Sequence, residues 1–146
     1  MEKINTTKKE ALLKNVCAVL IHLPGPLILA ASFYLSSLPT IHIIEDANIS
    51  DKLIHFVCFA GLTGAWSWWW TPKAVKTRPI RSALITICAV SLYGIIDEFH
   101  QSFTPGRECS ALDWLADTLG AVLGVSAGFW SMRVFPKIKP LFSRKH

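Results

Sequence analysis

The sequence predicts an all-α, polytopic membrane protein with four transmembrane helices and a polar cluster on the extracytoplasmic side. Of its 146 residues, 51% are hydrophobic, and they stand in blocks instead of following a helical or strand period. Charged residues are absent from residues 15–44, 53–72, 82–96 and 118–132. A spanning helix needs about 20 largely apolar residues. Within a single domain, residues 1–146, we therefore expect spans near residues 16–37, 53–71, 80–98 and 113–133.

The first two expected spans meet this length directly, and the last two must include polar ends. Their uncharged runs hold fifteen residues each, which is about 22 Å of helix. The aliphatic part of the Arg81 side chain can extend to the membrane surface. At the opposite boundary, we expect one of Asp97 and Glu98 in the third span, and Asp117 in the fourth, to lie just inside the membrane. In the first span, the sequence Pro24-Gly25-Pro26 predicts a kink. A soluble domain of fully buried helices is the weaker interpretation, because the segments lack polar faces.

The basic residues are divided unevenly along the chain. Thirteen of the fifteen Lys and Arg residues lie before residue 15, in the segment 73–81 or after residue 132. The other two are Lys52 and Arg107. Four spans place the thirteen residues on one side, which the positive-inside rule makes cytoplasmic, together with both termini. The lipid bilayer is the expected partner. Nucleic-acid binding is not indicated, because the basic residues lack a folded platform. The sequence does not define an oligomeric state.

No cofactor and no metal are predicted. The four cysteines lie in apolar spans or in a polar loop, without the spacing of a disulfide framework or a zinc site. A weaker hypothesis assembles a metal site from Asp51, His55, Glu98 and Asp113. These side chains offer oxygen and nitrogen ligands, but no HExxH or paired-histidine spacing supports the hypothesis.

The first polar cluster is Asp51, Lys52 and His55, at the start of the second expected span. Asp51 and His55 are four residues apart, so they share one helix face. Asp51 suits two roles equally, a helix N-terminal cap and a site residue. A carboxylate one turn from His55 can fix the tautomer of the imidazole and raise its basicity. We therefore favour site membership for His55 over a structural role.

The second polar cluster follows the third expected span. Asp97 and Gln101 share a helix face with Tyr93, and Glu98 stands beside them. The Pro105-Gly106 pair predicts a turn that returns Arg107 towards the bundle. Arg107 either neutralises a nearby carboxylate or grips a phosphate or carboxylate of a ligand in bidentate fashion. Both roles remain open.

Asp113, Asp117, Gly120 and Gly124 continue the cluster along one face of the fourth expected span. Gly120, Gly124 and Gly128 have the GxxxG spacing that allows close approach of a neighbouring helix. We therefore expect this face to pack against the second and third spans. The two carboxylates then face protein and not lipid.

These motifs together resemble the VanZ-like family of small bacterial membrane proteins. The resemblance covers about residues 30–128. It rests on Leu35-Ser36-Ser37, on Asp51-Lys52-x-x-His55-Phe56 and on the run Tyr93-Gly94-x-x-Asp97-Glu98-x-x-Gln101-x-Phe103-x-Pro105-Gly106-Arg107, followed by Ser110, Asp113, Asp117 and Gly120. Several members carry Asn at the position of Asp117. The resemblance implies a four-helix protein of the bacterial cytoplasmic membrane, with its polar residues on the outer face. For the founding members it also implies a link to glycopeptide (teicoplanin) resistance.

The leading functional hypothesis is a site in the outer leaflet that binds or modifies an anionic lipid-linked or cell-envelope molecule. The expected ligand-binding residues are Lys52, Gln101 and Arg107. The expected proton-handling residues are His55 and Glu98, and the supporting polar network is Asp51, Asp97, Asp113 and Asp117. We expect His55, Glu98, Arg107 and Asp113 to meet, with neighbouring members within about 4 Å of each other. Whether the protein is an enzyme is open: one alternative is a hydrolase or transferase. Another is a structural polar network that only fixes the helix bundle.

Overall fold

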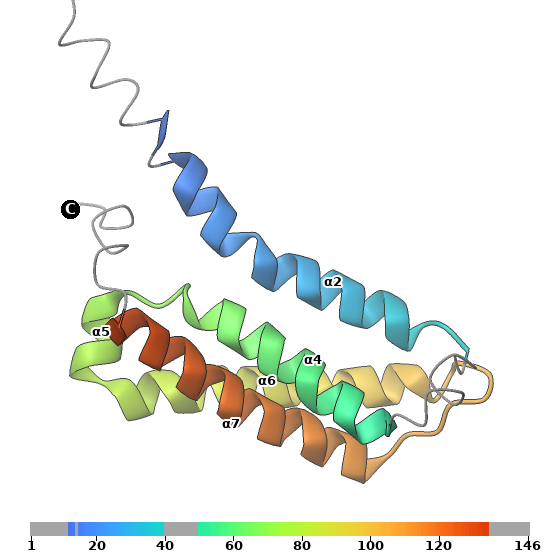
Figure 1. Ribbon diagram of the computed structural model, residues 1–146. Coiled ribbons are helices and arrows are strands. Elements are labelled where there is room, and N and C mark those ends of the chain that lie inside the picture. Colours follow the sequence, from blue (N-terminus) through green and yellow to red (C-terminus); the bar gives the residue numbers. More distant parts are fainter. Residues whose placement is uncertain (1–11, 14, 40–49, 135–146) are drawn as a thin grey trace, which may run out of the picture.

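The computed structural model describes residues 12, 13, 15–39 and 50–134, and this part of the chain is helical with no strand. The elements are α2 (Pro24–Ser36), α4 (Asp51–Ser67), α5 (Pro72–Thr77), α6 (Pro79–Gln101) and α7 (Ala111–Val134). Four long helices form a bundle, and the short α5 joins α4 to α6 at one end of it (Figure 1). The all-α fold class is therefore confirmed. The N-terminal segment and the tail after residue 134 lie outside the described residues.

Three helices are long and apolar enough to cross a membrane. They are Asn15–Ser36, Pro79–Gln101 and Ala111–Val134. The expectation of four spanning helices is wrong at the second position. There α4 has 17 residues, which is about 26 Å of helix and shorter than the roughly 30 Å hydrocarbon core. Its first turn holds Asp51 and Lys52, and it ends at Ser67, four residues before the expected end of the apolar run.

The outer surfaces of these helices are apolar. Large hydrophobic side chains with at least 48% of their surface exposed include Leu27, Phe33, Leu84, Leu92, Leu119 and Leu123. Water would penalise so much exposed hydrocarbon, whereas lipid chains would not. This surface argues against the soluble alternative and for a bundle surrounded by lipid.

The closest helix pair is α4 with α7, and glycines on α7 make the contact possible. A Cβ atom added to Gly120 would collide with the carbonyl oxygen of Phe56, and one added to Gly124 with the carbonyl oxygen of Ala60. A Cβ atom added to Gly128 would meet the side chain of Ser67 at 2.5 Å. The face predicted from the GxxxG spacing therefore packs against the backbone of α4, as small residues at membrane helix interfaces allow.

Two apolar clusters stabilise the bundle. The first contains Phe59, Leu62, Val90 and Ala121 in the middle of the bundle. The second contains Val75, Val125, Phe129 and Met132 at the α5 end. The sequence did not predict α5. Its N-terminus is capped by Thr71, whose hydroxyl accepts the amide of Ala74 at 3.2 Å, and Pro72 occupies the first helical position.

The opposite end of the bundle brings four chain segments together. The end of α2, the start of α4, the end of α6 and the start of α7 all lie there (Figure 1). The hydroxyl of Thr104, in the loop after α6, donates to the carbonyl oxygen of Ser36 at 3.3 Å and so ties this loop to α2. The helix that contains α2 is interrupted at Leu23, next to the predicted kink at Pro24. All residues of the expected site belong to this end.

Candidate functional site

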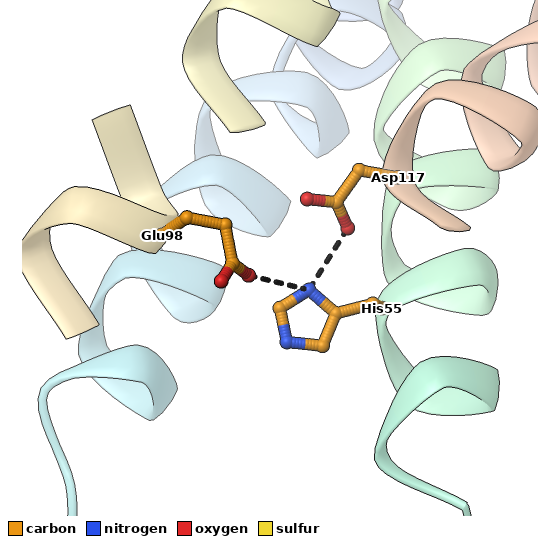
Figure 2. A group of neighbouring side chains, drawn as sticks. All are labelled: His55, Glu98 and Asp117. Carbon is orange, nitrogen blue, oxygen red and sulfur yellow. Dashed lines mark hydrogen bonds and ion pairs between the residues drawn. The ribbon is translucent and has the colours of Figure 1, made fainter. Parts of the chain in front are cut away.

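A buried histidine stands between two buried carboxylates that come from different helices (Figure 2). The Nδ1 atom of His55 on α4 lies 2.9 Å from Oδ1 of Asp117 on α7 and 3.7 Å from Oε1 of Glu98 on α6. The short contact is a hydrogen bond, and because an ionised carboxylate can only accept, Nδ1–H of His55 is the donor when Asp117 is ionised. Asp117, and not Asp51 as expected, therefore fixes the tautomer of His55. Asp51 has a half-exposed side chain near the helix start.

A glycine on α6 makes room for the buried carboxylate of Asp117. A Cβ atom added to Gly94 would lie 2.9 Å from Oδ2 of Asp117 and 3.3 Å from a ring carbon of Phe59. Both contacts are shorter than the separation of about 3.5 Å that packed atoms prefer. Gly94 is therefore part of the site. The sequence showed that Gly94 lies beside Tyr93 and Asp97, but not that its missing side chain makes room for Asp117.

Two carboxylate oxygens in this group lack a hydrogen-bond partner among the described residues. Oε2 of Glu98 accepts the backbone amide of Ser110 at 2.7 Å, which attaches α6 to the start of α7. Oε1 of Glu98 and Oδ2 of Asp117, however, are both buried and unpartnered. Buried polar atoms usually have a partner, so these two oxygens call for an explanation.

A second chain of contacts runs from α6 through the loop to α4. Nε2 of Gln101 donates to Oδ2 of Asp97 at 3.0 Å, and Nη1 of Arg107 donates to Oε1 of Gln101 at 3.3 Å. Nη1 of Arg107 also lies 3.7 Å from Oδ1 of Asp51. The Nε atom of Arg107 is buried, and Arg107 therefore has one buried donor without an acceptor among the described residues.

The expected ligand-binding residue Lys52 is already paired. Its Nζ atom lies 2.9 Å from Oδ1 of Asp113, and the lysine side chain is 48% exposed. Of the four residues expected to meet, His55 and Glu98 approach each other, whereas Arg107 and Asp113 contact Asp51 and Lys52 instead. The reason is that Asp51 and Lys52 lie in the first turn of α4. Asp51 pairs with Arg107 of the loop, and Lys52 pairs with Asp113 on α7.

A cavity of about 70 Å³ adjoins the histidine between α2, α4 and α6. Its polar lining is Ser32, Ser36, Asp51, His55, Asp97, Gln101 and Arg107. The second ring nitrogen of His55, Nε2, points away from both carboxylates in Figure 2. Residues from both polar clusters of the sequence thus line one cavity.

A larger, apolar cavity of about 420 Å³ lies between the same three helices, nearer the α5 end. Its lining is Leu29, Leu62, Trp66, Trp69, Trp70, Ile85, Thr86, Ala89, Val90 and Tyr93. Phe59, which lines the small cavity, stacks against Tyr93, which lines the large one, with ring centroids 5.7 Å apart. The two cavities are therefore neighbours along one inter-helix space.

The described residues contain one group that has the geometry of a metal site. His55, Glu98 and Asp117 each offer a ligand atom, and these atoms lie within 4.8 Å of one another. This group differs from the set considered in the sequence, because it excludes Asp51 and Asp113. The sequence predicted that the face of Asp117 packs against the second span, but not its pairing with His55, from which 62 residues separate it.

Apolar outer surfaces and a polar site at one end define this chain as a helical integral membrane protein. The family model described as VanZ/LLP1 matches residues 11–133. The chain therefore belongs to the VanZ/LLP1 family, which confirms the resemblance seen in the sequence motifs. No curated protein and no solved structure matches the chain.

Proposed function

We propose that the polar end of the bundle binds the head group of an anionic lipid or lipid-linked cell-envelope molecule in the outer leaflet. The observation that carries this proposal is the pair of neighbouring cavities between α2, α4 and α6. One cavity is small and polar, and the other is large and apolar. A membrane lipid has the same division into a polar head and a hydrocarbon chain, in the same order along the membrane normal.

The small cavity supplies hydrogen-bond donors for an anionic group. The guanidinium of Arg107 lines it, and the Nε–H of that group has no acceptor among the described residues. A guanidinium binds phosphate or carboxylate through a planar pair of donors, which a lysine cannot reproduce. Gln101 accepts from the other side of the same guanidinium and so helps to orient it. Arg107 is therefore the proposed anchor for the head group.

The large cavity suits a hydrocarbon chain. Its wall includes Leu62 and Val90 of the buried core together with the rings of Trp66 and Trp69, which stack with centroids 5.4 Å apart. The hydroxyl of Thr86 already accepts the indole N–H of Trp70 at 2.8 Å. Little polar surface remains in the wall, and a volume of about 420 Å³ is in the usual range of ligand pockets.

The distribution of basic residues supports an extracytoplasmic position for this site. Lys73, Lys76, Arg78 and Arg81 lie in or beside α5, at the end of the bundle opposite the site (Figure 1). Basic residues concentrate on the cytoplasmic side of membrane proteins. Although α4 is shorter than the three apolar helices, it carries the chain through the bundle from the site end to the α5 end (Figure 1). We therefore infer that the site faces outwards and both termini face the cytoplasm of a bacterial cell.

His55 supplies the second contact with the head group. Asp117 holds the proton of Nδ1, so Nε2 carries a lone pair that can accept a hydrogen bond from a hydroxyl of the head group, or a proton. An aspartate–histidine pair of this kind is also the arrangement used for general-base catalysis. We infer binding as the function and treat a hydrolase or transferase step, with His55 or Glu98 as the base, as an extension of it.

The second candidate is a purely structural network, and specific contacts favour it. Lys52 is bonded to Asp113, and Arg107 approaches Asp51, so both basic residues have intramolecular carboxylate partners. In this alternative the polar residues fix the arrangement of the helices, and any function belongs to a partner protein.

Lipid binding distinguishes these two candidates. The purified protein in detergent is titrated with phosphatidylglycerol or phosphatidylcholine and followed by native mass spectrometry. We expect a preference for phosphatidylglycerol that Arg107→Gln reduces roughly 10- to 100-fold, the effect of losing about 1.5–3 kcal/mol from a charged hydrogen bond. Arg81→Gln, at the opposite end, is the matched control and should keep the preference. Equal binding of both lipids, or an unchanged preference in Arg107→Gln, would favour the structural network.

We also infer, from the VanZ-like resemblance alone, that this binding alters susceptibility to teicoplanin. The comparison is between cells that express the native protein and cells that express Arg107→Gln at equal abundance. A difference in the minimum inhibitory concentration of teicoplanin is expected. Equal concentrations would show that lipid binding and glycopeptide susceptibility are unrelated in this protein.

A further inference from the structure

We propose that His55, Glu98 and Asp117 bind a divalent first-row transition cation such as Mn²⁺ or Zn²⁺. The three side chains come from α4, α6 and α7 and converge on one point in Figure 2. The cation site itself goes beyond the proposed function. Its consequence for the head group, given below, rests on that function.

The separations between the ligand atoms fit a metal ion. Bonds of about 2.1 Å at angles between 90° and 109° place two ligand atoms roughly 3.0–3.4 Å apart. Nδ1 of His55 lies 2.9 Å from Oδ1 of Asp117 and 3.7 Å from Oε1 of Glu98, on either side of this range. All three ligand atoms lie within 4.8 Å of one another. Small side-chain rotations would bring them to coordination distance.

The two unpartnered oxygens are the independent evidence for a cation. Asp117 is 0% exposed and Glu98 is 3% exposed. Each keeps one buried oxygen without a hydrogen-bond partner in the described residues, Oδ2 in Asp117 and Oε1 in Glu98. A buried carboxylate that lacks compensation is costly. A divalent cation would compensate both carboxylates at once, which the single proton on Nδ1 of His55 does not do.

The charge balance of the site gives a second reason. Among the described residues, the carboxylates of the site outnumber its basic side chains by five to two: Asp51, Asp97, Glu98, Asp113 and Asp117 against Lys52 and Arg107. An anionic head group entering this region would meet repulsion from the excess of negative charge. A divalent cation in the buried group would offset most of this excess and make the cavity suitable for an anion.

Coordination would also change what His55 offers to the cavity. When a cation binds Nδ1 of the neutral imidazole, the single ring proton is carried by Nε2. The nitrogen that points away from the carboxylates then becomes a donor in place of an acceptor. A donor suits a phosphate or carboxylate, whereas a lone pair repels it. The cation would therefore prepare both the charge and the hydrogen bonding of the site for an anion.

The donor set favours a transition cation over calcium or magnesium. Zinc and iron accept imidazole nitrogen together with carboxylate oxygen, and carboxylate oxygen suits manganese, whereas calcium and magnesium prefer oxygen ligands. Three protein ligands leave further coordination positions for water or for a ligand oxygen. Asp97 is also buried, and its Oδ1 likewise lacks a hydrogen-bond partner among the described residues. Gln101 donates to its Oδ2, however, and Asp97 does not belong to the group of possible ligands.

The test is direct binding of Mn²⁺ and Zn²⁺ to the purified protein in detergent after removal of metals with EDTA. Isothermal titration calorimetry should give about one site per chain, and Mn²⁺ should give an electron paramagnetic resonance signal with coupling to one imidazole nitrogen. Asp117→Asn and Glu98→Gln should each weaken binding at least tenfold. Asp97→Asn, which removes a buried negative charge near the group but no ligand, should weaken binding less than either ligand variant does. Circular dichroism shows whether each variant is folded.

Three outcomes would overturn the proposal: no saturable binding, binding unchanged in folded Glu98→Gln and Asp117→Asn, or equal loss in Asp97→Asn. If either ligand variant fails to fold, the nitrogen coupling in the native protein decides: its absence refutes the site. Lipid binding with and without EDTA separates this inference from the proposed function. Phosphatidylglycerol preference that survives EDTA supports the head-group site and refutes the role of the cation in it. Metal binding without any lipid preference supports the cation site and refutes the lipid function.

Discussion

The α4–α7 contact makes a sharp prediction for Gly124. In Gly124→Ala the new Cβ would lie 2.9 Å from Cβ of Thr63 and 2.9 Å from the backbone nitrogen of Gly64, and it would collide with the carbonyl oxygen of Ala60. Atoms in contact prefer at least about 3.5 Å, so the two helices must separate by roughly 0.6 Å or more. Backbone atoms cannot move aside as a flexible side chain can. Overpacking of this kind costs about 1–3 kcal/mol.

The assay is reversible unfolding of the purified protein in mixed micelles, followed by circular dichroism. Gly124→Ala should lower the free energy of unfolding by the stated amount. Gly61→Ala is the matched control, because nothing lies within 4 Å of a Cβ added to Gly61 on the exposed face of α4. It should be neutral or stabilise the helix by about 0.5–1 kcal/mol. Equal stability of the two variants would refute the close packing of α4 on α7.

Three further predictions concern topology, the Lys52–Asp113 ion pair and the support of the site. Reporter fusions at Gly106 should read outside and those at Lys76 inside; an inside reading at Gly106 would reverse the orientation. Lys52→Ala should lower the free energy of unfolding by about 1–3 kcal/mol, because the lysine is half-exposed but its partner Asp113 is buried and loses its cation; unchanged stability would show that this pair does not stabilise the bundle. Gly94→Ala should displace Asp117 and weaken Mn²⁺ binding in calorimetry, although alanine favours a helix; native affinity in a folded variant would contradict the role of Gly94.

The fold class follows from the sequence because lipid exposure leaves a simple pattern of uncharged runs. The glycine spacing on α7 likewise predicted the packed face correctly, since only small residues permit such close approach. The count of spanning helices was wrong because the uncharged run between Lys52 and Lys73 includes the residues after Ser67, where α4 has already ended. An uncharged run shows where a helix can lie, but not where its last turn stops.

The sequence predicted that these polar residues lie near one another at one end of the bundle, but not which of them pair. Sequence spacing along one helix suggested Asp51 as the partner of His55, because residues four apart share a face. The true partner is Asp117, which is brought there by the packing of α7 on α4. Contacts between helices depend on the rotation of each helix about its axis. Periodicity does not fix that rotation against a neighbour of unknown position.

The claim that an anionic head group occupies the polar end is tested most directly by the lipids that accompany the protein. Native membranes are solubilised, the protein is purified, and its bound lipids are extracted and identified by mass spectrometry. We predict enrichment of one anionic lipid or lipid-linked molecule over its share of the membrane, and loss of that enrichment in Arg107→Gln but not in Arg81→Gln. Bound lipids that match the bulk membrane in both the native protein and Arg107→Gln would contradict the account.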